Sequence, residues 1–368
     1  MNFPHDLLGE YRAQVVDATG RLWVTRGYDV FYSDDLGETF TFRTTIETRW
    51  LKKQSSKWDI TTRLLRRGFL QLQPSEDGSL LGVVYGAVVR CEPGDDRFTQ
   101  VFERPGRTMK LETLPGGEIF AGEYYFNRKR DEVLVFRSGD GGRTWSEVYR
   151  FKAGAIRHIH ALVYDKRCDR LIVLTGDTDP ESKVLFTTDG FKSVTVLSEG
   201  SQRSRAMTIQ PTEGGYFLPT DTPFEQNYIQ YLKFDGKLSI RCPIVGSCLG
   251  GSQVSGWSLF ATATEPSLVN FNPSVILYGT ADGIEWHVIH TWRVDRWSWP
   301  TTLQAAAFQF GRLIMASGDN RTGYLFGTPV AIRKTDGQLH RWKLNGVNGE
   351  THSSLLKPEL HADKQIVR

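Results

Sequence analysis

A three-part pattern recurs along the chain: an apolar run, a turn that contains Gly or Asp, and a second apolar run. Two apolar runs around a short turn are typical of a β-hairpin, because Gly accepts positive φ and Asp hydrogen-bonds its own backbone. No amphipathic run is long enough to predict a major helix. The pattern therefore predicts an all-β protein. Its turns fall at Gly20, Gly78, Gly117, Asp169, Gly215, Gly256 and Gly311.

A second and more specific pattern is a turn of the form Ser-x-Asp-x-Gly-x-Thr-Trp, which occupies residues 138–145. Residues 33–40 repeat it with Phe in place of Trp, and weaker copies occupy residues 187–193 and 280–286. Asp and Gly suit a tight turn between two strands. The aromatic residue would begin the next strand with its side chain buried.

The spacing of these turns predicts the architecture. Their aspartates, Asp35, Asp140, Asp189 and Asp282, lie two, one and two units of about 50 residues apart, a period expected of propellers or solenoids. Turns at 94–96, 234–236 and 335–337 fill the gaps. Seven turns of each kind predict a β-propeller with seven four-stranded blades. Six blades remain an alternative if the divergent stretch 43–57 displaces one.

The repeat predicts one propeller domain over residues 1–345, followed by a C-terminal tail, 346–368, without a blade pattern. The stretch 48–67 is rich in Lys and Arg and is expected to form a long basic excursion between the first two blades. In the seventh blade, the first two strands are expected at Leu303–Phe310 and Leu313–Ser317.

Composition and charge narrow the function classes. The chain has 368 residues and a net charge of +3, too small by itself to indicate nucleic-acid binding. No apolar run reaches the length of a membrane span. No secretory signal is visible, so a cytoplasmic location is expected, or secretion if a leader precedes this chain. The four cysteines show no Cys-x-x-Cys spacing; Cys242 and Cys248 could pair, or all four could be reduced thiols.

Candidate functional residues gather on one predicted face. In each blade the strands run up and down from the axis outward, so the first strands begin and the second strands end on the same face. The Ser-x-Asp turns lie on the opposite face and are expected to be structural. Basic residues at the first-strand starts are Arg12, Arg67, Lys110, Arg157, Arg203 and Arg205. Polar residues at the second-strand ends are Tyr124, Asp177, Asp179, Asp221, Glu225, Asn227, Glu265 and Asp319.

His158 and His160 add to this face, because alternation along a strand places them on one side. Guanidinium groups suit carboxylate or phosphate. A mouth lined with Arg, His, carboxylates and aromatic residues therefore suits an acidic sugar. Two plainer interpretations stay open: the arginines and carboxylates could pair and hold the blades together, and the histidines could be hydrogen-bonded core residues.

The Ser-x-Asp turns resemble the Asp-boxes, or BNR repeats, of sialidase-superfamily β-propellers over nearly the whole chain. The middle third, at 157–160, 175–179, 201–205 and 225–228, resembles bacterial sialidase-like repeat proteins. True sialidases use three arginines and a Tyr–Glu pair, with the first arginine in a Phe-Arg-Ile-Pro pattern; here the matching place reads Tyr11-Arg12-Ala13-Gln14. Propeller polysaccharide lyases and uronate-directed hydrolases share the ring and use His, Tyr and Arg. The resemblance thus implies a carbohydrate-active enzyme whose partner is an acidic oligo- or polysaccharide.

Two mechanisms fit cleavage at a uronate-type sugar. In β-elimination, Arg203 or Arg205 would neutralise the carboxylate, His158 or His160 would take the C5 proton, and Tyr124 or the other histidine would protonate the leaving oxygen. In hydrolysis, two carboxylates would flank the bond. The candidate carboxylates are Asp177, Asp179, Asp221 and Glu265, and the expected substrate-binding residues are Arg12, Arg67, Lys110, Arg157, Arg203, Arg205, Glu225 and Asn227.

A non-catalytic alternative is a glycan-binding or assembly-platform propeller, because a fold alone does not determine a function. Nucleic acid is not expected as a partner, since the basic residues lie among carboxylates. No cofactor and no metal are expected. His158, His160, Asp177 and Asp179 are the residues that could hold a metal, but they form no zinc signature.

Overall fold

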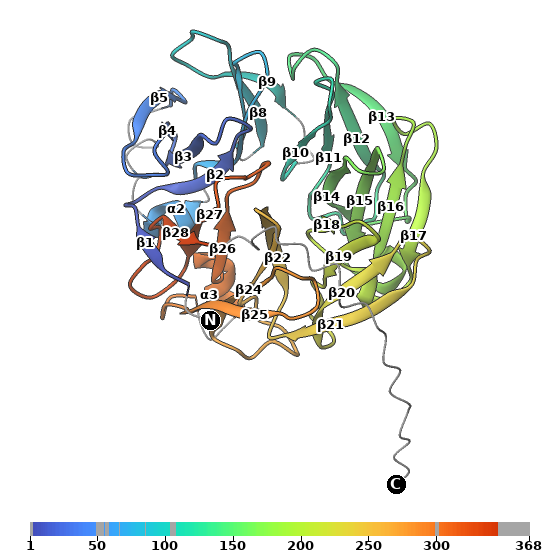
Figure 1. The fold of residues 1–368 in the computed structure, drawn as a ribbon. Coiled ribbons are helices and arrows are strands. Elements are labelled where there is room, and N and C mark those ends of the chain that lie inside the picture. Colours follow the sequence, from blue (N-terminus) through green and yellow to red (C-terminus); the bar gives the residue numbers. More distant parts are fainter. Residues whose placement is uncertain are drawn as a thin grey trace, which may run out of the picture.

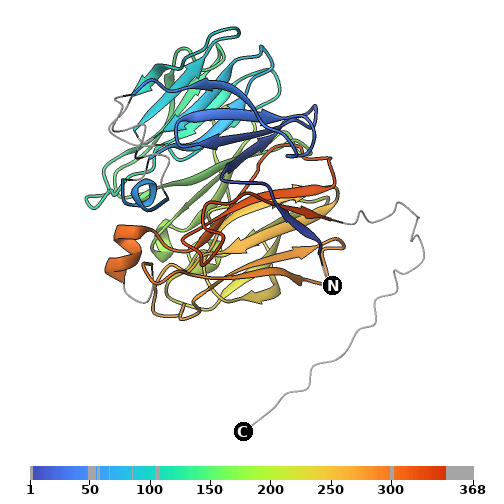
Figure 2. The same cartoon turned by 90° about the vertical axis from the view of Figure 1, so that its left-hand side faces the viewer.

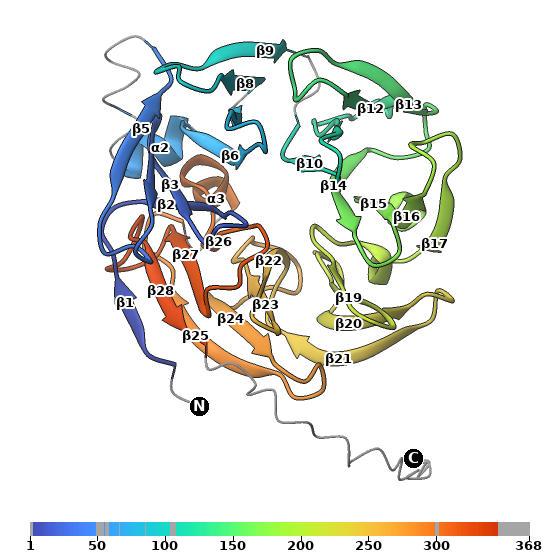
Figure 3. The same cartoon turned by 45° about the horizontal axis from the view of Figure 1, so that its top comes forward.

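The computed structural model describes residues 3–48, 55, 59–65, 67–84, 86–103, 108–298 and 302–344. In these residues, seven antiparallel sheets of four strands each are arranged as blades around a central axis (Figures 1 and 3). The protein is a seven-bladed β-propeller. The prediction of an all-β propeller with seven blades is confirmed, and the six-blade alternative is wrong. Residues 346–368, predicted to form a tail, lie outside the described residues.

In each of the first six blades, four consecutive strands pair with their neighbours in the chain. The strands of blades one to three are β2 (Arg12–Val16), β3 (Leu22–Arg26), β4 (Asp29–Ser33), β5 (Thr41–Thr45), β6 (Phe69–Pro74), β7 (Leu80–Val84), β8 (Ala87–Cys91), β9 (Thr99–Glu103), β10 (Leu111–Thr113), β11 (Ile119–Gly122), β12 (Val133–Ser138) and β13 (Ser146–Phe151). The strands of blades four to six are β14 (His158–Asp165), β15 (Arg170–Gly176), β16 (Lys183–Thr187), β17 (Thr195–Glu199), β18 (Gln210–Pro211), β19 (Gly215–Pro219), β20 (Asn227–Lys233), β21 (Leu238–Ile244), β22 (Cys248–Val254), β23 (Trp257–Thr262), β24 (Ser274–Thr280) and β25 (His287–Arg293).

The seventh blade closes the ring with both ends of the chain. Its strands from the axis outward are β26 (Arg312–Met315), β27 (Tyr324–Val330), β28 (His340–Lys343) and the N-terminal strand β1 (His5–Leu7). Strand β1 pairs antiparallel with β28, with Asp6 opposite Arg341. Arg341 also forms ion pairs with Asp6 at 2.8 Å and with Glu38 at 2.7 Å. The sequence did not predict β1, because its three residues carry no pattern of their own.

A helix replaces the strand predicted at Leu303–Phe310. Helix α3 (Thr302–Phe308) contains three consecutive alanines, the residue with the highest helix propensity. The strand predicted second, at Leu313–Ser317, is therefore the innermost strand, β26. Asp319 consequently lies in the β26–β27 turn on the opposite face, where it pairs with Lys166 at 3.4 Å; its predicted place on the candidate face is wrong. For the same reason the turn at 335–337 connects β27 to β28.

The other Ser-x-Asp turns connect the third and fourth strands of their blades, as predicted. In blade one, the Asp35 carboxylate accepts hydrogen bonds from the Thr39 backbone N–H at 2.9 Å and the Thr39 hydroxyl at 2.6 Å. These bonds lower the pKa of Asp35 to about 2. Asp140 accepts the equivalent bonds from Thr144. Each turn thus satisfies its own carboxylate, which is the arrangement expected of a structural element.

The insertion after blade one contributes helix α2 (Asp59–Leu65), and α2 and α3 lie on the same face of the ring (Figure 2). Arg63 joins them: its Nε donates to the Phe308 carbonyl at 2.7 Å, and its backbone carbonyl accepts from Gln309 Nε2 at 3.0 Å. Buried Arg63 also pairs with Asp295 at 2.6 Å and Asp336 at 2.9 Å. Of the predicted basic excursion, residues 49–54, 56–58 and 66 lie outside the described residues.

Two smaller points concern the chain as a whole. All four cysteines are free thiols, so Cys242 and Cys248 do not pair. In the part of the chain that the structure describes, no helix has the length and apolar character needed to cross a membrane.

Candidate functional site

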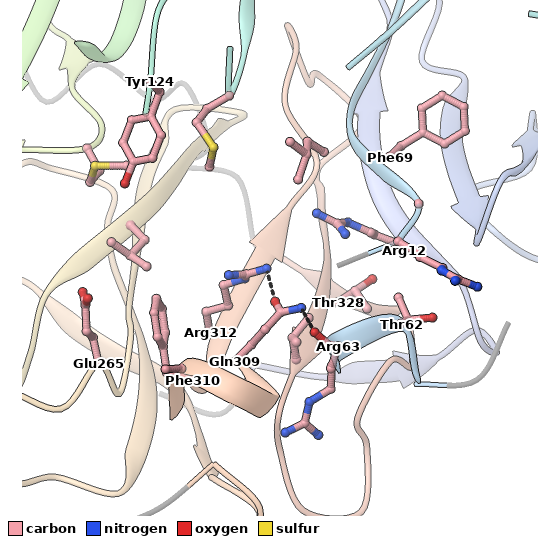
Figure 4. Close-up of a pocket in the computed structure, with 18 of the residues that line it drawn as sticks. Arg12, Thr62, Arg63, Phe69, Tyr124, Glu265, Gln309, Phe310, Arg312 and Thr328 are labelled. Carbon is pink, nitrogen blue, oxygen red and sulfur yellow. Dashed lines mark hydrogen bonds between the residues drawn. The ribbon is translucent and has the colours of Figure 1, made fainter. Parts of the chain in front are cut away.

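A cavity of about 770 Å³ lies on the α2–α3 face of the ring, and residues from all seven blades line it (Figure 4). Helices α2 and α3 contribute Thr62, Arg63 and Ala306 to its wall. Ten residues selected from the sequence line this cavity. They are Arg12, Arg67, Tyr124, Arg157, His158, His160, Asp177, Arg205, Asp221 and Glu265.

Five other selected residues are not among those that line the cavity: Lys110, Asp179, Arg203, Glu225 and Asn227. Asp179 begins a short 3-10 helix and accepts a hydrogen bond from Gln202 Nε2 at 2.8 Å. The buried Asn227 amide accepts from the Thr222 backbone N–H at 2.9 Å and donates to the Thr222 carbonyl at 2.8 Å. Asn227 therefore stabilises its own loop, and Asp179 joins its loop to the short 3-10 helix Gln202–Ser204. Arg203 stacks over an aromatic ring outside the cavity, and Glu225 and Lys110 are exposed.

Asp177, which follows β15, is the centre of the polar cluster. Its carboxylate accepts a hydrogen bond from Arg157 Nη1 at 2.6 Å and lies 3.2 Å from Arg205 Nη2. Its backbone carbonyl accepts from Arg205 Nη1 at 2.8 Å. Burial opposes ionisation, but contacts with the two histidines and with Arg205 outweigh it and hold the pKa of Asp177 far below its ordinary range. Asp177 is therefore a fixed negative charge that positions its neighbours, and it is not a proton donor.

The two histidines lie on β14 with their rings toward the cavity. A β-bulge falls between Ile159 and Ala161, so His160 is the extra residue without a partner in the β14–β15 register. His158 Nδ1 lies 2.9 Å from the Tyr125 carbonyl oxygen, and His160 Nδ1 lies 2.9 Å from the Ala206 carbonyl oxygen. The two Nε2 atoms are 3.1 Å apart. Burial, the largest cause, lowers the pKa of His160.

Gly176 makes room for this arrangement. It pairs with His158 across β14 and β15. A Cβ at Gly176 would lie 2.3 Å from His160 Cε1, far inside van der Waals contact. The end of β15 must therefore carry glycine if the His160 ring is to keep its place.

Tyr124 and two carboxyl groups complete this wall. The Tyr124 ring packs on His158 at 4.2 Å between centroids, and burial together with the charges of Asp177 and Asp221 raises its pKa to about 12. Burial raises the pKa of Asp221 to about 7 and raises that of Glu265 above its ordinary value. The wall thus offers a phenol that stays protonated and one carboxyl group, Asp221, that can carry a proton near neutral pH.

The opposite wall carries two arginines (Figure 4). Arg12 begins β2 and Arg312 begins β26, the innermost strands of adjacent blades. Burial and the nearby charge of Arg312 lower the pKa of Arg12 to about 9. Arg12 has no acidic partner among the described residues, and its Nε has no hydrogen-bond partner there. Arg312 Nη2 donates to Gln309 Oε1 at 2.7 Å.

Arg312 and Gln309 line the cavity but could not be identified from the strand pattern of the sequence. The strand-start rule that selected Arg12 would also have selected Arg312 if the Ala-rich run before it had been recognised as a helix. It also missed apolar lining residues such as Met109, Met207 and Phe126. The Arg157 guanidinium lies over the Phe126 ring at 4.4 Å. Only the tertiary structure brings these apolar side chains to the cavity.

The fold and this cavity define the class: a seven-bladed β-propeller with a polar site at the axis. No protein-family model matches the chain, and no curated protein matches it. Solved structures match the fold. YCF48 bound to a D1 peptide is 11% identical with a TM-score of 0.56, over 94% of this chain and 98% of that one.

Two further structures are similar at the level of the fold. The extracellular domain of the putative one-component system BT4673 from B. thetaiotaomicron is 9% identical, with a TM-score of 0.55 over 91% of this chain and 39% of that one. A chain of the mitotic checkpoint complex is 8% identical, with a TM-score of 0.52 over 92% and 90%. At these identities the likeness shows the propeller fold alone.

Proposed function

We propose that the cavity binds an acidic sugar of the uronate type and cleaves its glycosidic linkage. One observation carries the proposal: anion-binding groups and proton-transfer groups line the same cavity. Arg12 and Arg312 come from the adjacent blades one and seven, and the proton-transfer groups of blades three to six are His158, His160, Tyr124, Asp221 and Glu265. A sugar ring whose carboxylate lies beside the bond to be cleaved needs groups that bind the carboxylate and groups that transfer protons.

The arginine wall supports anion binding. Two like charges close together raise each other's electrostatic energy, and burial strengthens the effect. The depressed pKa of Arg12 expresses that cost. A carboxylate between Arg12 and Arg312 would relieve it with charge-assisted hydrogen bonds. Arg203 and Arg205, expected from the sequence to hold the carboxylate, are less suited: Arg203 is outside the lining and Arg205 is paired with Asp177.

The opposite wall supports two chemistries. In β-elimination a histidine Nε2 would accept the proton next to the carboxylate, and the Tyr124 hydroxyl would donate to the leaving oxygen. In hydrolysis Asp221 and Glu265 would act as acid and as base or nucleophile, because the Asp177 carboxylate is already paired with Arg157 and Arg205 and Asp179 is outside the lining. The resemblance of the turns to Asp-boxes is consistent with either chemistry, since that superfamily acts on acidic sugars.

A second candidate is capture of an anionic ligand without catalysis. The similar propeller YCF48 has a bound peptide in its structure, and a peptide carboxylate would suit the same two arginines. This candidate predicts binding that depends on Arg12 and no turnover.

The test is a screen of the protein against acidic oligo- and polysaccharides, recording new reducing ends and the ultraviolet absorbance of an unsaturated uronate. Reducing ends with absorbance would identify elimination, and reducing ends alone would identify hydrolysis. Arg12→Gln should lower kcat/KM by at least about tenfold, because a charge-assisted hydrogen bond contributes about 1.5–3 kcal/mol.

Arg203→Gln is the matched control, since Arg203 lies near the same face but outside the lining. It should leave turnover unchanged. Equal losses in both variants would refute the assignment of the arginine wall. Binding without turnover would replace the enzyme proposal with the capture candidate.

A further inference from the structure

The ring nitrogens of His158 and His160 pose a chemical problem. A backbone carbonyl can only accept a hydrogen bond, so each Nδ1 that contacts one must carry the proton. Both contacts are 2.9 Å long. In the neutral rings both Nε2 atoms then present bare lone pairs, and these atoms face each other at 3.1 Å. Two lone pairs at that distance repel unless an electrophile lies between them.

A carboxylate completes the same pocket. Asp177 Oδ1 lies 3.5 Å from His160 Nε2 and 3.7 Å from His158 Nε2. Among the described residues, this is the group of three whose ligand atoms lie within 4.8 Å of one another. We propose that His158, His160 and Asp177 bind a divalent first-row transition-metal ion such as Zn²⁺.

The distances fit such an ion. Metal–nitrogen bonds of about 2.0–2.1 Å place two ligand nitrogens about 2.9–3.4 Å apart in octahedral or tetrahedral geometry. The observed separation of 3.1 Å lies inside that interval. The carboxylate oxygen needs to move by only a few tenths of an ångström.

The surroundings orient the ligands in advance. Metal-binding histidines commonly donate their second N–H to a backbone carbonyl, which fixes the tautomer and the ring plane. Both rings have that contact, to Tyr125 and Ala206. The β-bulge at His160 and the missing Cβ at Gly176 place the second ring beside the first. The carbonyl contacts, the β-bulge and Gly176 thus all help to orient the two histidine ligands.

The charged groups around the two histidines are compatible with a bound cation. Arg157 and Arg205 contact Asp177, but three carboxylates, Asp177, Asp221 and Glu265, line this part of the cavity. Arg157 binds Oδ2, and Oδ1 lies 3.2 Å from Arg205 Nη2 and 3.5 Å from His160 Nε2, so the ion would share Oδ1 with Arg205. The ion would face the cavity, where it could contact a bound ligand.

This inference does not rest on the proposed function, but it changes one part of it. Histidines that hold a metal have no lone pair to offer, so the base in an elimination would be another group. The competing occupant is a single proton shared by the two Nε2 atoms and balanced by Asp177. The proton and the metal exclude each other, which makes the inference testable without a substrate.

The experiment titrates chelator-treated full-length protein with Co²⁺, whose visible absorption reports nitrogen and oxygen ligands, and then displaces Co²⁺ with Zn²⁺. We expect one equivalent to bind per chain, with a ligand-field spectrum that Zn²⁺ abolishes. His160→Asn should weaken binding by at least about 100-fold, because loss of a ligand exceeds the 10–100-fold cost of losing an outer partner. His287→Asn, at a half-buried histidine near Glu285 and outside the cavity lining, is the control and should bind like the wild type.

Absence of a Co²⁺ spectrum in the wild-type protein would overturn the inference and leave the shared proton. Equal loss in His160→Asn and His287→Asn would also overturn it, because binding would then not depend on this cluster. If His160→Asn does not fold, Gly176→Ala serves instead: it keeps every ligand but displaces the His160 ring, and unchanged affinity in that variant would contradict the geometry.

Discussion

Replacing Gly176 by alanine is expected to displace the His160 ring and to destabilise the protein. The new Cβ would lie 2.3 Å from Cε1, 3.0 Å from Nε2 and 3.2 Å from Nδ1 of His160. The ring cannot turn away into solvent, because only 1% of the His160 side chain is exposed. Relief of the clash therefore moves the ring by about 1 Å, judged against ordinary contact distances.

The cost has two parts. Overpacking a filled site costs about 1–3 kcal/mol. The displaced ring also weakens its hydrogen bond to the Ala206 carbonyl, and a buried polar group left without its partner costs about 1–3 kcal/mol. A Gly→Ala substitution also lowers the chain entropy of the unfolded state, which stabilises the folded protein by about 0.4–1 kcal/mol and offsets part of this cost. The net expectation is a loss of about 1–5 kcal/mol in the free energy of unfolding.

The assay is thermal unfolding followed by circular dichroism, with every variant scanned at the same rate. Gly139→Ala is the matched control: a Cβ at Gly139 meets nothing within 4 Å, and Gly139, like Gly176, does not have positive φ. It should melt at or slightly above the wild-type temperature, whereas Gly176→Ala should melt several degrees lower. Equal melting temperatures for the two variants would refute the close packing of Gly176 against His160.

Three further predictions concern pH and ring closure. Asp221 has a pKa of about 7, above its unfolded value, so its contribution to stability is present below about pH 4 and is lost as the pH rises through 7. The free energy of unfolding of Asp221→Asn, measured by thermal melts, should therefore rise relative to that of the wild type by up to about 4 kcal/mol between pH 4 and pH 8. Burial and the neighbouring His5 and His290 lower the pKa of His340 to about 3, so its contribution is present above about pH 6.5 and is lost toward pH 3. His340→Leu should therefore resist acid better than the wild type, and an unchanged acid midpoint would contradict this. Arg341→Gln should speed hydrogen exchange in β1 without a large change in melting temperature, because the acidic partners of Arg341 are exposed. The control Arg150→Gln breaks exposed pairs in blade three and should leave hydrogen exchange in β1 unchanged.

Part of the candidate site could be predicted from the sequence and part could not. The prediction that first strands begin and second strands end on one face identified ten residues that line the cavity, including Asp177 and the residues that contact it. It succeeded because the starts and ends of these inner strands lie close to the axis. The prediction failed at Asp179 and Asn227, since their side chains bond to nearby residues. It failed at Arg312 because a helix occupies the place where a strand was predicted.

The sequence by itself predicted the propeller and the order of its first six blades, whereas the structure excluded the six-blade alternative and set the strands of blade seven. Each Ser-x-Asp turn is stabilised by hydrogen bonds within about five residues, such as Asp35 to Thr39, so its structure can be read from a short stretch of chain. The repeat of these local units was enough to predict the propeller.

Only the tertiary structure decided how the ring closes and what its cavity can bind. Strand β1 forms because β28, more than 300 residues away, offers an open edge. Arg12 and Arg312 meet because ring closure places the first and last blades side by side. The pKa of Asp221 and the tautomers of His158 and His160 depend on burial and on carbonyls from other blades. Electrostatic energies depend on distance and on exclusion of water, and neither quantity exists until the ring is folded.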